Sequence, residues 1–292
     1  MEQLLGFFVY LATVTSIFAM LAMSLDLQVG SCGLVNFGQV VFLGVGAYAT
    51  AIAVDQGLDP FTSMALSTLV GAFFGVLLSL TVRNLSGTYW GILSLSMAEV
   101  VRLVMLNERW IGGGANGISV VVSIPYFSLI VVAATALVYA LLRVVAASPF
   151  GRVIRMIREG DRLPLALGKN VLVYKMETMV IGGAIGGLAG SFYALSNGYM
   201  SPDDMLPIET FIVWAMMVLG GRGNATGIVV GAVLVQVFFV GTRFLSNLIP
   251  IEADTLSALR FVLIGVLIML IMMFRPEGAL PERRRIYRVA GD

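Results

Sequence analysis

The chain contains no histidine and a single cysteine, Cys32. Histidine is the side chain that titrates near neutral pH and the commonest metal ligand, so its absence removes most acid–base and metal chemistry. One cysteine excludes a disulfide within the chain and a cysteine-lined metal site. We therefore predict that the protein is not an enzyme and has no catalytic residues, no metal and no cofactor.

A phosphate-binding loop of the G-x-x-x-x-G-K-[ST] type is also missing. The pair Gly168–Lys169 is followed by Asn170, and the upstream glycine of the motif is absent. We therefore expect that this chain does not itself hydrolyse a nucleotide by this route.

Charge is scarce throughout the sequence. Charged residues make up 12% of the 292 residues and hydrophobic residues 59%, whereas soluble domains carry about 25% charged residues. Apolar runs of about 20 residues recur along the whole length, as in chains that cross a membrane several times. The predicted fold is an all-α, polytopic membrane helical bundle that forms a single transmembrane domain over residues 1–292. No long basic face is present, so nucleic acid is not an expected partner.

Nine segments are long and apolar enough to be membrane spans. They are Leu4–Leu25, Cys32–Val54, Thr62–Val82, Tyr89–Leu106, Val120–Arg143, Met176–Gly198, Ile208–Gly220, Thr226–Leu248 and Leu256–Phe274. We predict nine crossings, with eight or ten as alternatives. Five glycines interrupt residues 29–46, and Ile208–Gly220 is short for about 30 Å of hydrocarbon, so each is a candidate Gly-broken or half-spanning helix.

Lysine and arginine gather in two segments, and basic residues in short loops stay on the cytoplasmic side of a membrane. Seven lie between Arg143 and Lys175, and five arginines lie in the tail. The loops that begin "DQGLDP" and "SPDDMLPIE" are acidic and lack lysine and arginine. We therefore predict that segment 148–175 and the tail 275–292 with the C-terminus are cytoplasmic, and that the acidic loops and the N-terminus are external.

Few ionisable residues fall inside the predicted spans, where they are costly and often functional. Glu99 and Arg102 are three residues apart, which places them on one helix face; they form either a mutually neutralised pair or part of a substrate path. A stand-alone secondary carrier or channel remains an alternative function, but it needs buried coupling carboxylates, and the other acidic residues lie at span ends. We therefore expect a nucleotide-driven partner on the cytoplasmic side to supply the energy for transport.

Seven motifs in order along most of the chain resemble the branched-chain amino acid permeases of ABC importers, in particular the LivM-type subunit. They are "VGSCGLVNFGQVVFLGVGAYATA" from Val29, "SGTYWGILSLSMAEVVRLV" from Ser86, "GGANGI" from Gly113, "SPFGRVIRMIREGDRLPLALGKNVLVYK" from Ser148, "GLAGSFYALSNGYMSPD" from Gly187, "VLGGRGNATGIVVGAVL" from Val218 and "FRPEG" from Phe274. The resemblance implies a multi-pass permease in the cytoplasmic (inner) membrane of a prokaryote. It implies four kinds of partner: a second related permease subunit, two cytoplasmic ATP-binding subunits, an extracytoplasmic solute-binding protein and membrane lipid. The implied substrates are branched-chain amino acids, and permeases of the same family for urea or short amides are an alternative.

Segment 148–175 is the predicted coupling loop to the ATP-binding subunits. Asp161 is expected to cap a short helix that Pro164 opens and Gly168 ends. An apolar patch ringed by charge suits insertion into a groove of a partner. The predicted coupling residues are Arg158, Glu159, Asp161, Arg162, Leu165, Ala166, Leu167 and Gly168. The alternative is a solvated basic loop that only sets the topology.

The substrate path is predicted at two glycine-broken segments, Gly33–Tyr48 and Gly220–Gly231. Unwound backbone in a membrane is tolerated where it is buried in protein or lines a cavity, and such breaks often mark transport sites. The alternative is that these glycines serve close packing and turns. The predicted path residues are Asn36, Gly38, Gln39, Gly44, Tyr89, Glu99 and Asn224. Bulky replacement of Gly38 or Gly44 is expected to block transport while leaving assembly with the ATP-binding subunits intact.

Overall fold

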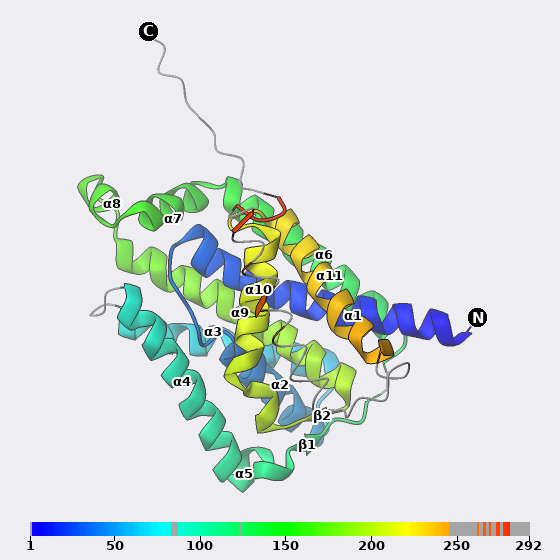
Figure 1. Cartoon of the computed structure of the whole chain (residues 1–292). Coiled ribbons are helices and arrows are strands. Elements are labelled where there is room, and N and C mark those ends of the chain that lie inside the picture. Colours follow the sequence, from blue (N-terminus) through cyan, green and yellow to red (C-terminus); the bar gives the residue numbers. More distant parts are fainter. Residues whose placement is uncertain are drawn as a thin grey trace.

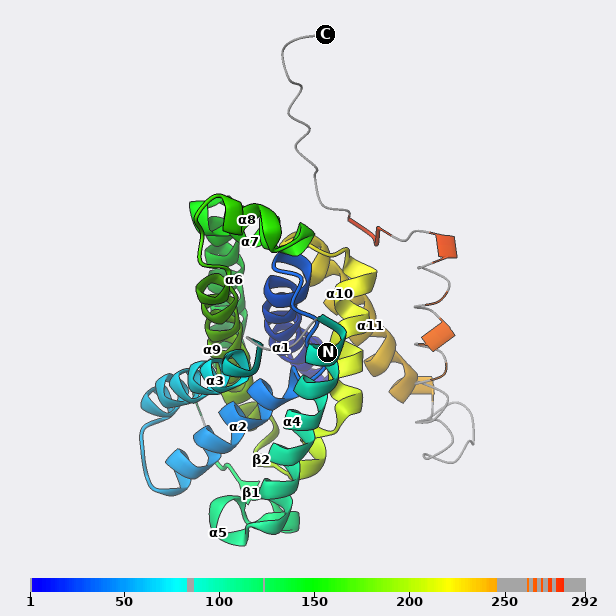
Figure 2. The ribbon, with the colours of Figure 1, turned by 90° about the vertical axis from the view of Figure 1, so that its left-hand side faces the viewer.

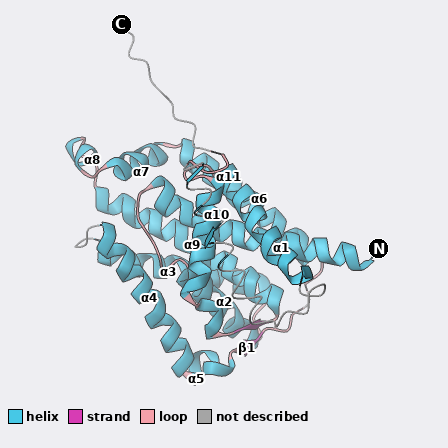
Figure 3. Ribbon diagram, in the orientation of Figure 1, coloured by secondary structure: helices cyan, strands magenta, loops and turns pink. Residues whose placement is uncertain are grey.

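A computed structural model describes residues 2–82, 87–122 and 124–245, together with residues 262, 265–266, 269, 273–274 and 277–280. Helices make up most of the described chain, and the two strands found in it are two residues each (Figure 3). The all-α membrane bundle predicted from the composition is therefore confirmed.

The first half of the chain forms α1 to α6. Its elements are α1 (Glu2–Asp26), a π-helix η1 (Leu27–Ser31), α2 (Val40–Asp55), α3 (Pro60–Val82), α4 (Gly87–Asn107), α5 (Arg109–Gly112), a 3₁₀ turn η2 (Gly114–Asn116), β1 (Ile118–Ser119) and α6 (Phe127–Ala147). The second half contains α7 (Pro149–Glu159), α8 (Arg162–Ala166), α9 (Val171–Asn197), β2 (Tyr199–Met200), a 3₁₀ turn η3 (Pro202–Met205), α10 (Pro207–Gly220) and α11 (Ala225–Leu245).

Five described helical segments are long and apolar enough to cross a membrane, and each contains most of a predicted span. They are Leu5–Ser31, Pro60–Thr81, Tyr89–Asn107, Phe127–Ala147 and Val171–Asn197. Two of these five segments begin at a clearly different residue than predicted. The helix α6 begins at Phe127 rather than at Val120. Ile118–Ser119 pairs with Tyr199–Met200, and the Val120 NH extends this pairing by donating to the Gly198 carbonyl at 2.8 Å. The helix α9 begins at Val171 rather than at Met176, because the side chain of Asn170 caps its first turn.

Two of the predicted spans form short helices, as the glycines predicted for the first and the length of the apolar run for the second. The helix α2 has 16 residues and follows a non-helical stretch at residues 33–39, and α10 has 14 residues. At 1.5 Å per residue they are about 24 Å and 21 Å long, less than the roughly 30 Å of a hydrocarbon core. The last predicted span, Leu256–Phe274, lies largely outside the described residues.

The helix α9 is the centre of the bundle, with α2 and α3 packed closely against it (Figures 1 and 2). Glycines permit this approach: a Cβ on Gly46 would collide with the backbone of Gly187, and one on Gly71 with the carbonyl of Gly183. Within a bilayer, hydrophobic burial does not drive helices to associate, and small residues stabilise the bundle by letting helices pack closely. The glycines of the "GGAIGGLAG" stretch therefore serve helix packing.

The two ends of the bundle differ in structure. One end carries α7 and α8, and the opposite end carries α5 and the β1–β2 pair (Figure 1). The turn at Gly221 lies near α7, and the backbone NH of Leu280 donates to the Gly220 carbonyl there, at 3.0 Å. Residues 277–280 and the coupling loop therefore share one end of the molecule.

Candidate functional site

The helix α7 is an amphipathic helix that lies on the end of the bundle. Ser148 begins it, because its hydroxyl accepts a hydrogen bond from the Gly151 NH at 3.2 Å and Pro149 occupies the first turn. Along its length Val153, Ile154 and Ile157 are buried. This apolar face attaches α7 to the transmembrane helices, so α7 and the bundle form one packed unit.

The helix α8 presents leucines outward from this end. The side chains of Leu163, Leu165 and Leu167 are 57%, 58% and 59% exposed, whereas Pro164 is buried. Gly168 ends the helix with φ +72°, a left-handed conformation that suits glycine. We call Leu163, Leu165, Ala166 and Leu167 the leucine knob.

Asp161 does not cap α8, contrary to the prediction. Its side chain makes no capping hydrogen bond, and its Oδ2 instead accepts from Lys175 Nζ at 2.7 Å. The attraction of the lysine ammonium favours this contact over the short-range bond to a backbone NH. The pair joins the start of α8 to the first turns of α9, and Glu159, Arg162 and Gly168 lie exposed around the knob.

Arg158 points into its own chain. Its Nη1 donates to the carbonyl of Gly30 in the π-helix η1. Gly33 fits closely beside it, since a Cβ on Gly33 would lie 3.1 Å from Arg158 Cα. A guanidinium donates strongly to an under-satisfied carbonyl, such as those at a disturbed helix end. Arg158 therefore connects α7 to the break between α1 and α2.

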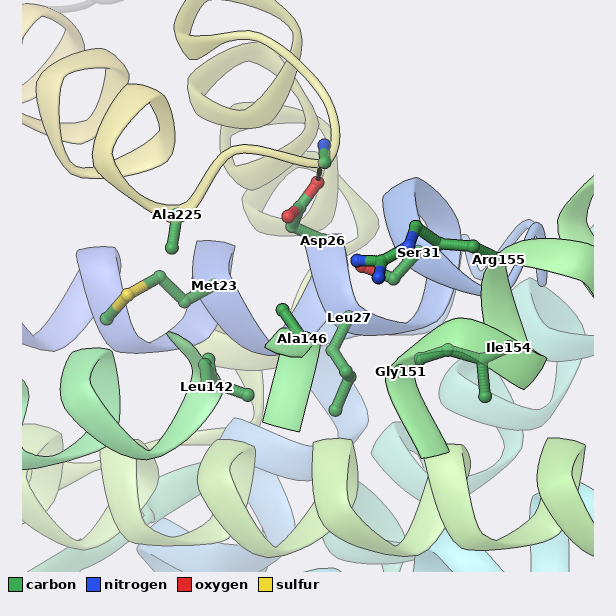
Figure 4. A pocket seen from close by; sticks show the side chains of 11 residues that line it. Met23, Asp26, Leu27, Ser31, Leu142, Ala146, Gly151, Ile154, Arg155 and Ala225 are labelled. Atoms are coloured by element: carbon green, nitrogen blue, oxygen red, sulfur yellow. Dashed lines mark hydrogen bonds between the residues drawn. The ribbon is translucent and has the colours of Figure 1, made fainter. Parts of the chain in front are cut away.

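A second contact joins the same break to the turn before α11. The Asp26 carboxylate, only 6% exposed, accepts from the Gly223 NH at 2.7 Å. A cavity lies beside this contact (Figure 4). It is lined by Met23, Asp26, Leu27, Ser31, Leu142, Ala146, Gly151, Ile154, Arg155, Gly223 and Ala225. The cavity therefore has walls from α1, η1, α6, α7 and the Gly221–Gly223 turn.

Asn36 is the centre of a buried polar network at the break itself. Its Nδ2 donates to Gln28 Oε1 at 2.7 Å and to Gln39 Oε1 at 3.2 Å, and its Oδ1 accepts from the Gly38 NH at 2.8 Å. Trp214 Nε1 donates to the Asn36 carbonyl at 2.9 Å. These bonds replace the helical ones that residues 33–39 lack, which meets the need to pair buried backbone groups.

The network continues into α1 and α9 through Ser24. Gln39 Nε2 donates to Ser24 Oγ at 2.8 Å, and that hydroxyl donates to the Gly182 carbonyl at 2.7 Å. Gln28 Nε2 is buried and has no hydrogen-bond partner among the described residues. Asn36 and Gln39 were predicted from the sequence as path residues. Ser24 and Gln28 complete the network with them and were not predicted. A polar side chain within an apolar run was the available signal for both.

Gly38 and Gly44 lie at close contacts within the bundle. A Cβ on Gly38 would collide with the Ser94 carbonyl, and one on Gly44 with the side chain of Met205. A bulky side chain at Gly38 must therefore displace backbone, which disturbs packing. That such a replacement leaves assembly with the ATP-binding subunits intact stays a prediction.

The remaining path residues lie apart from this network. Tyr89 is 65% exposed on α4, and Glu99, also on α4, is paired with Arg102 at 2.6 Å. Asn224 lies in the turn before α11. Its Oδ1 accepts from the Thr226 NH at 3.1 Å, and its Nδ2 donates to the Leu280 carbonyl at 3.1 Å. The predicted path residues therefore occupy four places: the buried break, the interior of α2 at Gly44, the outer side of α4 and the turn before α11.

Within the described part of the chain, no group of three or more acidic, cysteine or histidine residues is placed to hold a metal ion.

Comparison with known proteins places these features in a family. Residues 7–272 match the family described as branched-chain amino acid transport system, permease component. The high-affinity branched-chain amino acid transport system permease protein LivM of Salmonella typhimurium is 30% identical over 312 residues, which cover 94% of this chain and 70% of that protein. The probable branched-chain amino acid transport permease protein LivM of Methanocaldococcus jannaschii is 28% identical and covered to 91% on both sides. A nucleoside ABC transporter permease protein, NupC of Lactococcus lactis, is 25% identical over 70% of this chain and 72% of its own length.

No solved structure matches the chain. The match to the family spans most of the sequence, and a relative 30% identical is covered over more than two thirds of its length. The chain is thus a multi-pass protein of the inner membrane that belongs to the family of permease components of branched-chain amino acid transport systems.

Proposed function

We propose that the chain is the membrane-spanning permease subunit of an ABC importer and moves branched-chain amino acids into the cell. Its partners would be a second related permease, two cytoplasmic ATP-binding subunits and an extracytoplasmic solute-binding protein. The family of the chain supports the permease role, and the geometry of the α7–α8 end supports attachment to an energy-supplying partner.

The observation that carries the proposal is the leucine knob. Two exposed leucines project from a five-residue helix at one end of the bundle, a third follows directly after it, and charged residues are next to them in the sequence. Arg162, Glu159 and Lys169 are exposed there and would be costly in hydrocarbon, so lipid does not cover this end. An apolar projection ringed by charge fits a groove on a water-soluble protein.

The packing of α7 connects the leucine knob to the membrane-spanning helices. Motion of α8 is transmitted to α7, and α7 is attached to η1 by its buried face and by the Arg158 bond to Gly30. The break at residues 33–39 follows directly in the chain and holds the Asn36 network. ATP-driven motion at the knob would therefore act on the unwound segment, which is the part of α1–α2 that can rearrange with the least loss of helical bonding.

The proposal is tested by reconstituting the complete transporter in lipid vesicles and comparing Ala166→Asp with Ala147→Asp. Both alanines are exposed at the same end of the bundle, but Ala147 lies at the end of α6 rather than in the knob. A carboxylate inserted into an apolar groove loses its hydration without gaining a partner. We expect Ala166→Asp to lower ATP-driven leucine uptake at least tenfold and Ala147→Asp to leave it nearly unchanged. Equal uptake in both variants would show that the knob only sets the topology.

The substrate is tested in the same vesicles. The relatives named for branched-chain amino acids cover 91–94% of the chain, whereas the one named for nucleosides covers 70%. We therefore expect unlabelled isoleucine and valine to compete with leucine uptake, and adenosine and uridine to have no effect. Competition by nucleosides alone would assign the chain to the second substrate class.

A further inference from the structure

One side of α4 faces away from the rest of the described chain. Its inner stripe of Trp90, Ser94 and Ala98 is buried, and its outer stripe is exposed at a spacing of three or four residues. The outer stripe consists of Tyr89, Ile92, Ser96, Val100 and Leu103. A stripe with this spacing covers one face of a helix.

An ion pair lies beside this outer stripe. Arg102 Nη2 and Glu99 Oε1 are 2.6 Å apart, and Arg102 Nε donates to Glu99 Oε2 at 3.0 Å. The Glu99 side chain is 36% exposed and that of Arg102 14%. Both lie within the span Tyr89–Asn107. Ionised groups inside a membrane face the protein interior or a watery cavity rather than lipid.

The helix break reaches the same side of the molecule at Phe37. Its backbone NH donates to Ser94 Oγ of α4 at 2.9 Å, and its ring lies 5.0 Å from Trp214 and 6.0 Å from Phe211, both of α10. The helices α4 and α10 contact each other, and both lie at the front in Figure 1. Phe211 is 46% exposed and Ile208 37% exposed. Phe37 therefore fills the seam between two outward-facing helices.

Neither lipid nor bulk water suits this surface, which we call the α4–α10 face. Lipid is disfavoured by the exposed part of the Glu99–Arg102 pair, because ionised groups inside a membrane are costly against hydrocarbon. Water alone is disfavoured because Tyr89, Ile92, Val100 and Phe211 expose a large apolar area. Another protein embedded in the membrane satisfies both conditions.

The outer side of α6 provides the contrast. Its exposed residues from Leu129 to Leu141 are leucine, valine and alanine only. No ionised group interrupts this stripe until Arg143 near the helix end. Such a face is suited to contact with acyl chains.

We propose, on the basis of the importer function proposed above, that the α4–α10 face is the surface on which the second membrane-spanning permease subunit docks. The Glu99–Arg102 pair then meets polar groups of that subunit instead of hydrocarbon. Phe37 and Phe211 pack against it at the seam, which places the helix break at the junction of the two permeases. A movement of the helix break therefore changes the contact between the two permease subunits.

The test compares lipid contact on the two faces. Single cysteines at Ile92 and Val100 of α4, and at Val132 and Leu137 of α6, carry a bimane fluorophore in the complete transporter; Cys32 is buried and stays unlabelled. Phospholipids brominated on the acyl chain quench a fluorophore that touches them. We expect labels on α6 to be quenched and labels on α4 to be quenched at least threefold less. Equal quenching on both helices, in complexes that still transport leucine, would overturn the proposed surface without touching the proposed function.

A second measurement shows whether the protection comes from the partner. The same labelled chains are purified as monomers in a brominated detergent, where α4 labels should be quenched as strongly as α6 labels. Protection that persists in the monomer would overturn the proposal, because the chain would then cover the face by itself. Val100→Trp should also lower copurification of the second permease at least fivefold, with Leu137→Trp as the matched control on α6.

Discussion

Asn36 shows how a membrane bundle accommodates a polar side chain. Its amide joins Gln28 to Gln39 and also holds the Gly38 NH, while its own carbonyl is held by Trp214. All of these groups are removed from water, so each would carry a desolvation cost without its partner. Asn36 therefore stabilises the unwound stretch between η1 and α2 in one conformation.

Asn36→Leu tests this role at nearly constant volume. The change leaves Gln28 Oε1, Gln39 Oε1 and the Gly38 NH with one partner fewer each, and one buried group left unpaired costs about 1–3 kcal/mol. We expect a clear drop in the apparent midpoint of thermal unfolding of the detergent-purified chain. Asn107→Leu is the control, because Asn107 is exposed and its Nδ2 bonds only the Leu103 carbonyl within its own helix. Equal midpoints for the two variants would contradict a stabilising role for the network.

At the scale of elements, α7 is the connection between the solvent-exposed α8 and the interrupted helix pair α1–α2. Its apolar residues are buried on the bundle, and Arg158 at its end bonds the carbonyl of Gly30. A π-helix leaves its carbonyls imperfectly paired and often accompanies function. The coupling loop is therefore part of the packed structure on one side and open to a partner on the other.

Arg158→Gln should weaken the transmission of motion without preventing attachment of the ATP-binding subunits. A hydrogen bond from a charged group contributes about 1.5–3 kcal/mol, which corresponds to about tenfold or more in an equilibrium. We expect the ATP-binding subunits to copurify normally while substrate-stimulated ATP hydrolysis falls by about that factor. Arg152→Gln serves as the control, since Arg152 lies exposed on the same helix. Loss of copurification in Arg158→Gln would instead place Arg158 in the docking surface itself.

At the scale of the whole molecule, the chain has two unlike ends. The knob, the start of α9 and residues 277–280 gather at one end, and the acidic loop at Pro202–Met205 lies at the other with β1 and β2 (Figure 2). The positive-inside tendency predicts that the first end faces the cytoplasm.

Cysteines at Lys169 and Asp203 test this orientation, because both residues are exposed and lie at opposite ends. A membrane-impermeant maleimide should label the Asp203 variant in spheroplasts and the Lys169 variant only in inside-out vesicles. Asp203 is a better site than Asp204, whose carboxylate accepts from Tyr193 and from the Ser201 NH. Labelling of the Lys169 variant in spheroplasts would reverse the topology and remove the basis for coupling to a cytoplasmic ATPase.

The membrane class, most of the helices and the position of α8 follow from the sequence alone. Runs of about 20 apolar residues and the clusters of arginine and glycine are local properties, so α3 and α4 were predicted nearly to the residue. The short helices α2 and α10 were also visible, because glycines and length mark where a helix cannot continue. The family followed from the order of the motifs along most of the chain.

The partners of the polar groups were decided only by the tertiary structure. Asp161 was expected to cap α8 and bonds Lys175 instead, and Arg158 was expected at the partner surface and bonds Gly30. The absent side chain of Gly38 makes room for the backbone carbonyl of Ser94, a contact that the local sequence does not reveal. A local sequence pattern indicates which polar groups need a hydrogen-bond partner. The partner lies 57 positions away for the Phe37 NH and 128 positions away for Arg158. Only the packing of the helices brings such distant segments within hydrogen-bonding distance.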